Sequence, residues 1–206
     1  MTRNLLLAAA LLVGLGGSAM AADLPATITC GSSMQLTGQD ANLGRYYRDA
    51  YVLTIDQINK AGGIKIGGKS IPITLKLLDN QSDANLAVRQ YVGLATQDKV
   101  DFLLGPYASG TTIPVSSVSE KYEIPMVEGG GASPQIFSRG YKYIFGLLPP
   151  ADDYFASTIA MLGQLTPKAH SVALVTADDS FDVSVAKGTR QLLAAAGMEI
   201  VLDQTY

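Results

Sequence analysis

Apolar and polar positions along the chain fall into short segments that predict strands alternating with helices. Short apolar runs bounded by glycine or polar residues indicate buried strands, whereas apolar residues three and four positions apart indicate helices. Strands are predicted at 26–34, 64–66, 71–78, 102–104, 124–128, 141–147, 172–176 and 199–202. Helices are predicted at 46–60, from a cap at Ser82 or Asp83 to 97, and at 111–122, 153–165 and 181–196. This alternation is typical of an α/β fold whose parallel sheet is covered by helices on both faces.

Two local features refine these elements. Residues 64–66 and 71–78 are separated by a Gly-Gly-Lys turn and are expected to form a hairpin. Pro114 falls near the start of the helix predicted at 111–122. A proline is tolerated there because the amides of a first helical turn have no helical partners in any case.

The first 22 residues have the pattern of an export signal. A short basic start containing Arg3 precedes an apolar run at 5–15, and small residues then lead up to Ala22. The apolar run is shorter than the roughly 20 residues that a membrane-spanning helix needs. We therefore expect cleavage and an exported protein rather than a membrane anchor.

Pro149 and Pro150 interrupt the alternation and are expected to form a linker or hinge. Residues 23–148 predict a first Rossmann-like lobe. Residues 149–206 offer only two strands and two helices, too few to cover a parallel sheet on both faces. We therefore expect the start of a second lobe, truncated at the end of this sequence. The strand residues expected to be poorly covered are Val172, Leu174, Val175, Ile200 and Val201.

Charge and rare residues exclude several function classes. The chain has 15 basic and 18 acidic residues; without Arg3, 14 against 18 leaves a net charge of about −4, so nucleic acid is not an expected partner. Cys30 is the only cysteine, which excludes an intrachain disulfide, and we expect it to be buried on the first strand. With His170 as the only histidine, neither a metal cluster nor the base of an acyl-transfer site is expected. We predict no catalytic residues, no metal and no cofactor.

Two loops rich in glycine and hydroxyl groups are the candidate ligand-binding site. Residues 105–111 follow one predicted strand, and residues 129–133 follow the next. Ligands of open α/β sheets bind beyond the carboxyl ends of the strands, where both loops are expected. Ser109, Gly110 and Thr111 open a helix, whose free amides suit an anion, and Ser133 adds a hydroxyl. The pattern predicts a carboxylate site without arginine or lysine; ordinary helix-capping turns are the alternative.

Several motifs together resemble the periplasmic solute-binding receptors of branched-chain amino-acid ABC transporters, the leucine-binding type. The motifs are Met-Gln-Leu-Thr-Gly at 34–38, Ile-Asn-Lys-Ala-Gly-Gly-Ile at 58–64, Leu-Asp-Asn-Gln-Ser-Asp at 78–83, and the two loops. The resemblance covers residues 28 to about 202. It implies a type I periplasmic-binding-protein fold, in which two Rossmann-like lobes close on a ligand.

The resemblance also assigns expected ligand contacts. Ser109 takes the place of a serine that holds the ligand carboxylate. Gly130 and Ala132 stand where the family has an alanine and a threonine, so one hydroxyl is lost and Ser133 is expected to replace it. Phe181 falls where an aromatic residue of the second lobe touches the ligand. The residues that hold the ligand ammonium would lie beyond the last residue of this sequence.

Each of four further side chains has two possible roles. Tyr46, Tyr47 and Tyr107 would favour an aromatic or otherwise apolar ligand if they line the pocket; alternatively they fill the core or a groove. Glu128 ends a predicted strand beside the second loop. It is expected either to meet a cation or an amide, or to be a solvated carboxylate at the rim.

The expected function is capture rather than catalysis. A periplasmic receptor, monomeric when full length, would bind a small carboxylate and deliver it to the membrane permease of an ABC transporter. The ligand would be a branched-chain or other amino acid, or an aromatic acid. A periplasmic sensory receptor built on the same lobes is the main alternative, and an exported enzyme is a further one.

Overall fold

The computed structural model describes residues 24–206, so the export signal predicted at 1–22 lies outside the described residues. The strands are β1 (Ile28–Met34), β2 (Ile64–Ile66), β3 (Lys69–Ile71), β4 (Ile73–Asp79), β5 (Phe102–Leu104), β6 (Met126–Glu128), β7 (Ile144–Gly146), β8 (Ser171–Thr176) and β9 (Glu199–Thr205). The α-helices are α1 (Ala41–Lys60), α2 (Ala84–Thr96), α3 (Ser109–Tyr122), α4 (Ala156–Leu162) and α5 (Ser180–Ala195). Two short 3-10 helices are η1 (Pro134–Ile136) and η2 (Ala151–Asp153).

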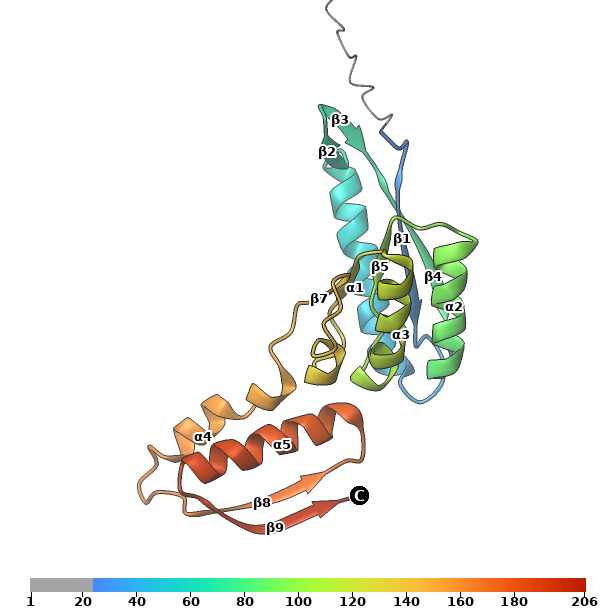
Figure 1. Ribbon diagram of the computed structural model, residues 1–206. Helices are drawn as coiled ribbons and strands as arrows, with labels where there is room; N and C mark the ends of the chain where they lie inside the picture. The colour runs from blue at the N-terminus through green and yellow to red at the C-terminus, as the bar shows by residue number, and fades with distance from the viewer. Residues whose placement is uncertain (1–23) are drawn as a thin grey trace, which may run out of the picture.

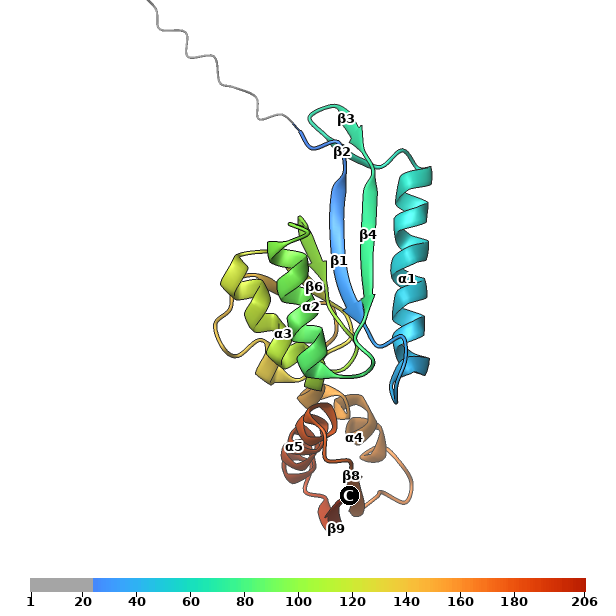
Figure 2. The same ribbon diagram turned by 90° about the vertical axis from the view of Figure 1, so that its right-hand side faces the viewer.

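The first unit, from β1 to β7, is built on a five-stranded sheet in the order β4-β1-β5-β6-β7. All neighbouring strands in it are parallel. Helix α1 covers one face, and α2 and α3 cover the other (Figure 2). The core under α2 and α3 includes fully buried Tyr91, Leu94, Leu103, Val115 and Met126. The predicted α/β fold with helices on both faces of a parallel sheet is confirmed in this unit.

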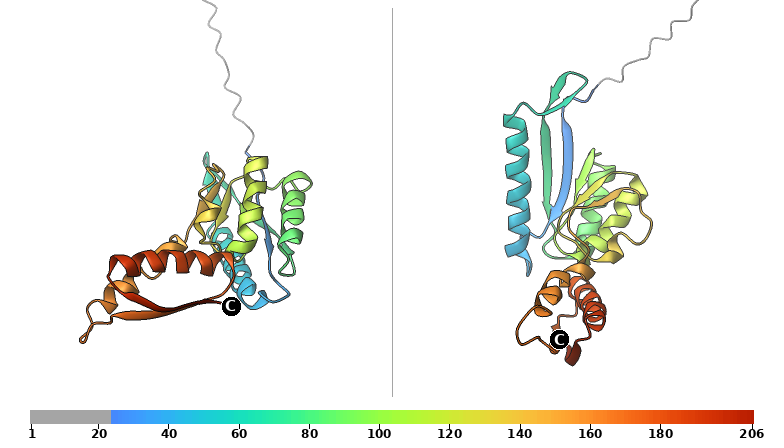
Figure 3. Two further views of the ribbon diagram at one scale, coloured as in Figure 1. Left: turned by 60° about the horizontal axis from the view of Figure 1, so that its bottom comes forward. Right: turned by 90° about the vertical axis from the view of Figure 1, so that its left-hand side faces the viewer.

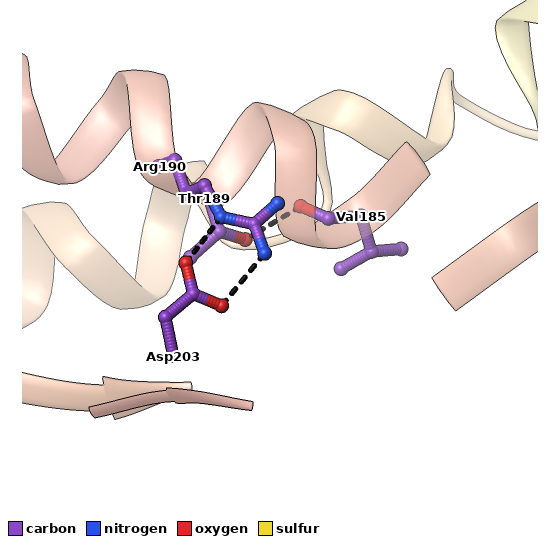
Figure 4. A network of polar contacts seen from close by, with 4 residues as sticks. All are labelled: Val185, Thr189, Arg190 and Asp203. Atoms are coloured by element: carbon purple, nitrogen blue, oxygen red, sulfur yellow. Dashed lines mark hydrogen bonds and ion pairs between the residues drawn. The ribbon is translucent and has the colours of Figure 1, made fainter. Parts of the chain in front are cut away.

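The second unit, from η2 to β9, contains a parallel pair of strands, β8 and β9, with α4 and α5 packed on it. It lies next to the carboxyl ends of the first unit's strands, with α5 on the side of the first unit (Figures 1 and 3). Arg190 of α5 holds Asp203 of β9 through two hydrogen bonds of 2.6 and 2.7 Å (Figure 4). On the same helix, the Thr189 hydroxyl donates to the Val185 carbonyl.

Coverage of the β8–β9 pair is only partly as expected. Val175 and Val201 are indeed 62% and 61% exposed. Val172, Leu174 and Ile200, however, are partly buried against a small core formed by Ile159, Leu193 and Met198. The two available helices therefore cover these three strand residues in part, although the sheet has only two strands.

Helix α1 begins at Ala41, five residues before the predicted start, and its half-buried face carries the expected Tyr47, Tyr51, Ile55 and Ile58. Gly44 obscured this beginning, because glycine usually counts against a helix. A Cβ on Gly44 would lie 2.0 Å from the carbonyl oxygen of Gln35. The glycine is therefore required by the close packing of α1 against the end of β1.

Two other predicted elements differ in the structure. The segment 71–78 is split at Pro72, which has no amide to donate to a strand partner. Residues before it form the expected hairpin with β2, whereas β4 after it pairs in parallel with β1. The helix predicted at 153–165 is shorter, with η2 ending at Asp153 and α4 covering only Ala156–Leu162.

Pro114 does not lie in the first turn of its helix, contrary to the prediction. Helix α3 begins at Ser109, which makes Pro114 its sixth residue and places it inside the helix. The carbonyl that a residue at this position would normally bond is that of Gly110. Gly110 is exposed, so water can satisfy this carbonyl in place of the missing amide.

Candidate functional site

The two predicted loops meet at the carboxyl edge of the first unit's sheet. The first loop (residues 105–111) follows β5, and the second loop (residues 129–133) follows β6, its neighbour. Successive crossovers reverse direction between β1 and β5, which makes this edge the kind of switch point where open α/β sheets bind ligands. The Ser109 hydroxyl oxygen accepts hydrogen bonds of 3.1 Å from the amides of both Ala132 and Ser133. The start of α3 therefore holds the second loop directly.

Gln35, which follows β1, holds the first loop. Its amide nitrogen donates to the Tyr107 carbonyl at 2.5 Å and to the Thr111 hydroxyl at 3.1 Å, and its carbonyl oxygen accepts from the Tyr107 amide. The Gln35 side chain is fully buried. Sequence reasoning missed this role, and the only available signal was a polar residue directly after an apolar strand.

Ala108 precedes α3 with φ 64° and ψ 148°, a backbone conformation that residues with a side chain rarely adopt. Its carbonyl accepts from the Thr111 and Thr112 amides. Strained backbone of this kind persists only where surrounding contacts enforce it, and it is enriched in binding and active sites. Here the Gln35 bonds on one side and the α3 amides on the other supply that enforcement.

Glu128 ends β6 and is fully buried between the two loops. Its Oε1 accepts hydrogen bonds from the Gly130 and Gly131 amides, and its Oε2 lies 3.2 Å from the Thr112 hydroxyl. Burial raises the pKa of Glu128 to about 8, although the two amides and Thr112 act in the opposite direction. The reading of Glu128 as a solvated rim carboxylate is wrong, and the reading that it meets an amide is confirmed, the amides being those of the backbone.

Three glycines of the two loops, Gly105, Gly130 and Gly131, are required by close approach. A Cβ on Gly105 would lie 1.8 Å from Oε2 of Glu128, and one on Gly130 would lie 2.6 Å from the Pro106 carbonyl oxygen. A Cβ on Gly131 would lie 2.7 Å from the Ile136 side chain. Side chains at these positions would therefore push the loops apart.

The second loop also contacts the second unit. The Ala151 amide donates to the Ala132 carbonyl at 2.9 Å, and the Ser133 and Ser184 hydroxyl oxygens are 2.9 Å apart. Ser184 donates its single proton to the Ser180 carbonyl, so Ser133 is the donor within the pair. In this arrangement the Ser133 proton is directed at α5, and its predicted role on a ligand stays a prediction.

Aromatic side chains from both units gather near the loops. The rings of Tyr47 and Tyr107 lie 5.5 Å apart, and those of Tyr154 and Phe181 meet edge to face at 5.2 Å. Burial, followed by the negative charges of Asp40, Asp179 and Asp182, raises the pKa of Tyr107. Because Asp179 caps α5 and Asp182 lies in its first turn, Tyr107 faces the start of α5.

The aromatic residues differ in what they contact. The Tyr47 hydroxyl donates to the Gly129 carbonyl at 3.2 Å, which fixes its ring beside the second loop. Phe181 packs with Ala132, Ala151 and Val185. Tyr46 is 71% exposed. Since Tyr46 and Tyr47 are successive residues of one helix, they point in different directions, and only Tyr47 is placed at the loops.

The predicted ligand contacts differ in how accessible they are. Ser109, Thr111, Ala132 and Ser133 are buried. Tyr107, Gly130 and Phe181 are half-buried, and Gly110 is exposed. All eight lie in the two loops or at the start of α5. The structure therefore brings them together around the junction of the two units, with the first-turn backbone of α3 at Gly110 open to solvent.

An apolar cavity of about 350 Å³ lies elsewhere, between α4, β8 and α5. None of the eight predicted ligand contacts lines it. Within residues 24–206, no group of three or more His, Cys, Asp or Glu is arranged to hold a metal ion. In the same range, no helix has the length and hydropathy that crossing a membrane requires.

Comparison with known proteins places the chain in a family. The pattern of the periplasmic binding protein family matches residues 27–206. A curated relative, Leu/Ile/Val-binding protein homolog 8 of Brucella suis, is 31% identical over 210 residues, covering 98% of this chain and 51% of the relative. Homolog 7 of the same organism is 30% identical, covering 96% of this chain and 49% of the relative. The chain thus spans about half the length of the curated relatives it matches.

Solved structures agree on the fold. The branched-chain amino acid transporter substrate-binding protein LivJ from Streptococcus pneumoniae, in complex with isoleucine, has a TM-score of 0.70 at 26% identity, covering 87% of this chain and 49% of that one. An ABC-transporter solute-binding protein from Rhodopseudomonas palustris, in complex with 3,4-dihydroxybenzoic acid, has a TM-score of 0.76 at 20% identity. The match covers 88% of this chain and 47% of that one. The family is one of binding proteins rather than enzymes, as the sequence indicated. This chain belongs to the periplasmic binding protein family.

Proposed function

We propose that the chain is part of an exported, periplasmic receptor that captures a small carboxylate between two lobes and delivers it to the membrane permease of an ABC transporter. In this proposal residues 1–22 are a cleaved export signal, residues 23–148 form the first lobe, and residues 149–206 begin the second. The observation that carries the proposal is the joining of the two loops by Ser109 at the carboxyl edge of the sheet. Neither loop contains an arginine or lysine, so the anion would be held by backbone amides and hydroxyls.

Ser109 is suited to donate to such an anion. A hydroxyl has one proton and two acceptor lone pairs. Both lone pairs of Ser109 are occupied by the Ala132 and Ser133 amides, which leaves the proton for a ligand oxygen. The first-turn backbone at Gly110 adds the positive end of the α3 dipole. The site thus offers donors already held in place before an anion arrives.

Burial of Ser109 indicates how a ligand would enter. Ser109 is fully buried beneath the second loop, and that loop is bonded to the second unit through Ala151 and Ser184. A ligand would reach the site when the second unit swings away about Pro149 and Pro150, and it would favour closure by contacting both units. Closure would also exclude water and strengthen the hydrogen bonds to the anion.

The aromatic pairs extend the proposal to ligand class. Tyr47 and Tyr107 come from the first unit, and Tyr154 and Phe181 come from the second. A ligand between them would have an apolar or aromatic body beyond its carboxylate. Branched-chain amino acids and hydroxylated benzoates both fit that description, and solved relatives hold isoleucine and 3,4-dihydroxybenzoic acid.

The proposal is tested by calorimetric titration of the full-length protein with L-leucine, L-isoleucine and 3,4-dihydroxybenzoate, with the corresponding alcohol or amide of each as a control. We expect at least one acid to bind and its uncharged control to bind far more weakly. Equal binding of acid and control would contradict a carboxylate site. Binding of none of these acids would contradict the proposed ligand class.

A further inference from the structure

Glu128 is a buried acidic group that the proposed capture mechanism does not use. It lies between the two loops. Its Oε1 accepts hydrogen bonds from the Gly130 and Gly131 amides, and its Oε2 lies beside the Thr112 hydroxyl of α3. Its carboxyl group also occupies the space that a Cβ on Gly105 would need. The side chain thus contacts both loops and the first part of α3, and it is fully buried among them.

The hydrogen-bond geometry indicates which form of Glu128 fits this position. The Thr112 hydroxyl oxygen lies 3.0 Å from the Ala108 carbonyl and 3.2 Å from Oε2 of Glu128. The hydroxyl has only one proton, and the Ala108 carbonyl can only accept. When Thr112 donates to Ala108, the contact with Oε2 is a hydrogen bond only if Glu128 carries a proton and donates it. A protonated Glu128 satisfies both contacts, whereas an ionised one satisfies a single contact at the expense of the other.

The surroundings of Glu128 offer no compensating positive charge. The titratable groups that face it are Tyr47 and Tyr51 of α1 and Tyr91 of α2. Their phenol protons are donated elsewhere, to the carbonyls of Gly129, Gly105 and Leu104 respectively. Glu128 also takes no part in the ion pairs found within residues 24–206. Ionisation would therefore leave a buried charge supported only by two backbone amides and by a Thr112 hydroxyl that would have to give up its bond to the Ala108 carbonyl.

We propose that Glu128 is a positioning residue that, in its protonated form, braces the second loop against the start of α3 and keeps the adjacent anion site free of a competing negative charge. The inference rests on the proposed function, because it concerns the same anion site. It also makes ligand capture depend on pH. An anion binds the protonated receptor better, so binding takes up a proton, and affinity falls as Glu128 ionises.

The brace is tested without any ligand. Amide ¹H–¹⁵N shifts of Gly130 and Gly131 are followed between pH 6 and 9.5 in the full-length protein. We expect both amides to titrate with a common midpoint near 8, as the raised pKa of Glu128 indicates, and Glu128→Gln to abolish that titration. Glu120→Gln is the matched control, because Glu120 also accepts two backbone amides, those of Lys142 and Tyr143, but lies at the other end of α3. Flat Gly130 and Gly131 shifts in the unmodified protein, or a titration that survives Glu128→Gln, would overturn the inference.

The effect on capture is measured with L-isoleucine and 3,4-dihydroxybenzoate at pH 6.5 and 8.5. The unmodified protein is expected to lose up to about fourfold in affinity over this range, the decrease in the protonated fraction of a group with a pKa near 8. Glu128→Gln removes this loss and retains the pH 6.5 affinity within about twofold, because its amide keeps one acceptor and one donor. Ionisation of the probe itself changes the affinity of both proteins equally, so it does not contribute to the difference between their pH dependences. If neither probe binds while the glycine amides titrate, the proposed ligand class fails and the brace stands. An equal pH dependence in both proteins overturns the positioning role.

Discussion

The Ser133 hydroxyl of the second loop donates to the Ser184 hydroxyl of α5 across 2.9 Å, and both residues are buried. Ser133 and Ser184 are 51 positions apart in the chain, yet this pair and the Ala151–Ala132 bond together join the two units. The loop proposed to receive the carboxylate is thus also the loop on which the second unit rests. We therefore expect a change in the loop on ligand binding to reach the junction between the units.

Removal of the Ser184 hydroxyl is expected to weaken this junction. Ser184→Ala takes the acceptor from buried Ser133, which costs about 1–2 kcal/mol of stability. The measurement is urea denaturation followed by circular dichroism, together with small-angle scattering for a shift towards the open form. Ser117→Ala is the control, because the Ser117 hydroxyl bonds only the Pro114 carbonyl of its own helix at the surface. Identical stability of Ser184→Ala and Ser117→Ala would show that the hydroxyl pair does not hold the units together.

Removal of the Ser109 hydroxyl is expected to weaken anion binding. Ser109→Ala loses the ligand donor and leaves the Ala132 and Ser133 amides without their acceptor. The expected loss in binding free energy is about 1–3 kcal/mol, measured by calorimetry with whichever of L-isoleucine or 3,4-dihydroxybenzoate binds. A uniform loss for the acid and for its uncharged control would indicate a structural effect only, and unchanged affinity for the acid would reject Ser109 as a ligand contact.

A side chain at Gly105 is expected to separate the two loops. Gly105→Ala places a Cβ 1.8 Å from the Glu128 carboxyl oxygen, and the overpacking costs about 1–3 kcal/mol of stability. Gly93→Ala is the matched control within α2, where a Cβ meets nothing within 4 Å. That substitution is expected to stabilise by about 0.5–1 kcal/mol, because alanine favours a helix. Denaturation curves in which the two variants change stability in the same direction would contradict the close packing described at Gly105.

Asp79 is expected to make stability depend on acid pH. Although burial alone would raise its pKa, hydrogen bonds from the Gln81 amide, the Thr37 hydroxyl and amide, and the Leu36 amide lower it overall. A group with a lowered pKa contributes stability above its unfolded pKa, and that contribution is lost as pH falls through the folded value.

The measurement is the free energy of unfolding between pH 6 and pH 3 for the unmodified protein and for Asp79→Asn. The unmodified protein is expected to lose stability towards pH 3, and the variant is expected to be less stable at pH 6 and to show a flatter dependence. Asp56→Asn serves as a control, because Asp56 forms a surface pair with Lys60, and such pairs contribute little. If the free energy of unfolding depends on pH as steeply in Asp79→Asn as in the unmodified protein, Asp79 is not the source of that dependence.

The amino-acid sequence by itself determined the α/β class, the parallel sheet and the position of both loops. These follow from local regularities: the spacing of apolar residues sets helix or strand, and glycine and hydroxyl residues after a strand mark a loop at its carboxyl end. Two local rules did not hold. Gly44 lies within α1 because the end of β1 packs against it, which is a tertiary contact. Pro114 lies inside α3 because the helix begins two residues earlier than predicted, at Ser109.

Only the tertiary structure decided which groups the polar side chains meet. Gln35 and Tyr107 are separated by 72 positions, and Thr112 and Glu128 by 16, so no local pattern encodes their pairing. The reading of Glu128 changed from two open alternatives to a buried acid between the loops, and Ser133 was found to face Ser184. The physical reason is that burial and hydrogen-bond partners depend on how strands and loops are placed in space, whereas the periodicity of a sequence specifies only what each segment can form.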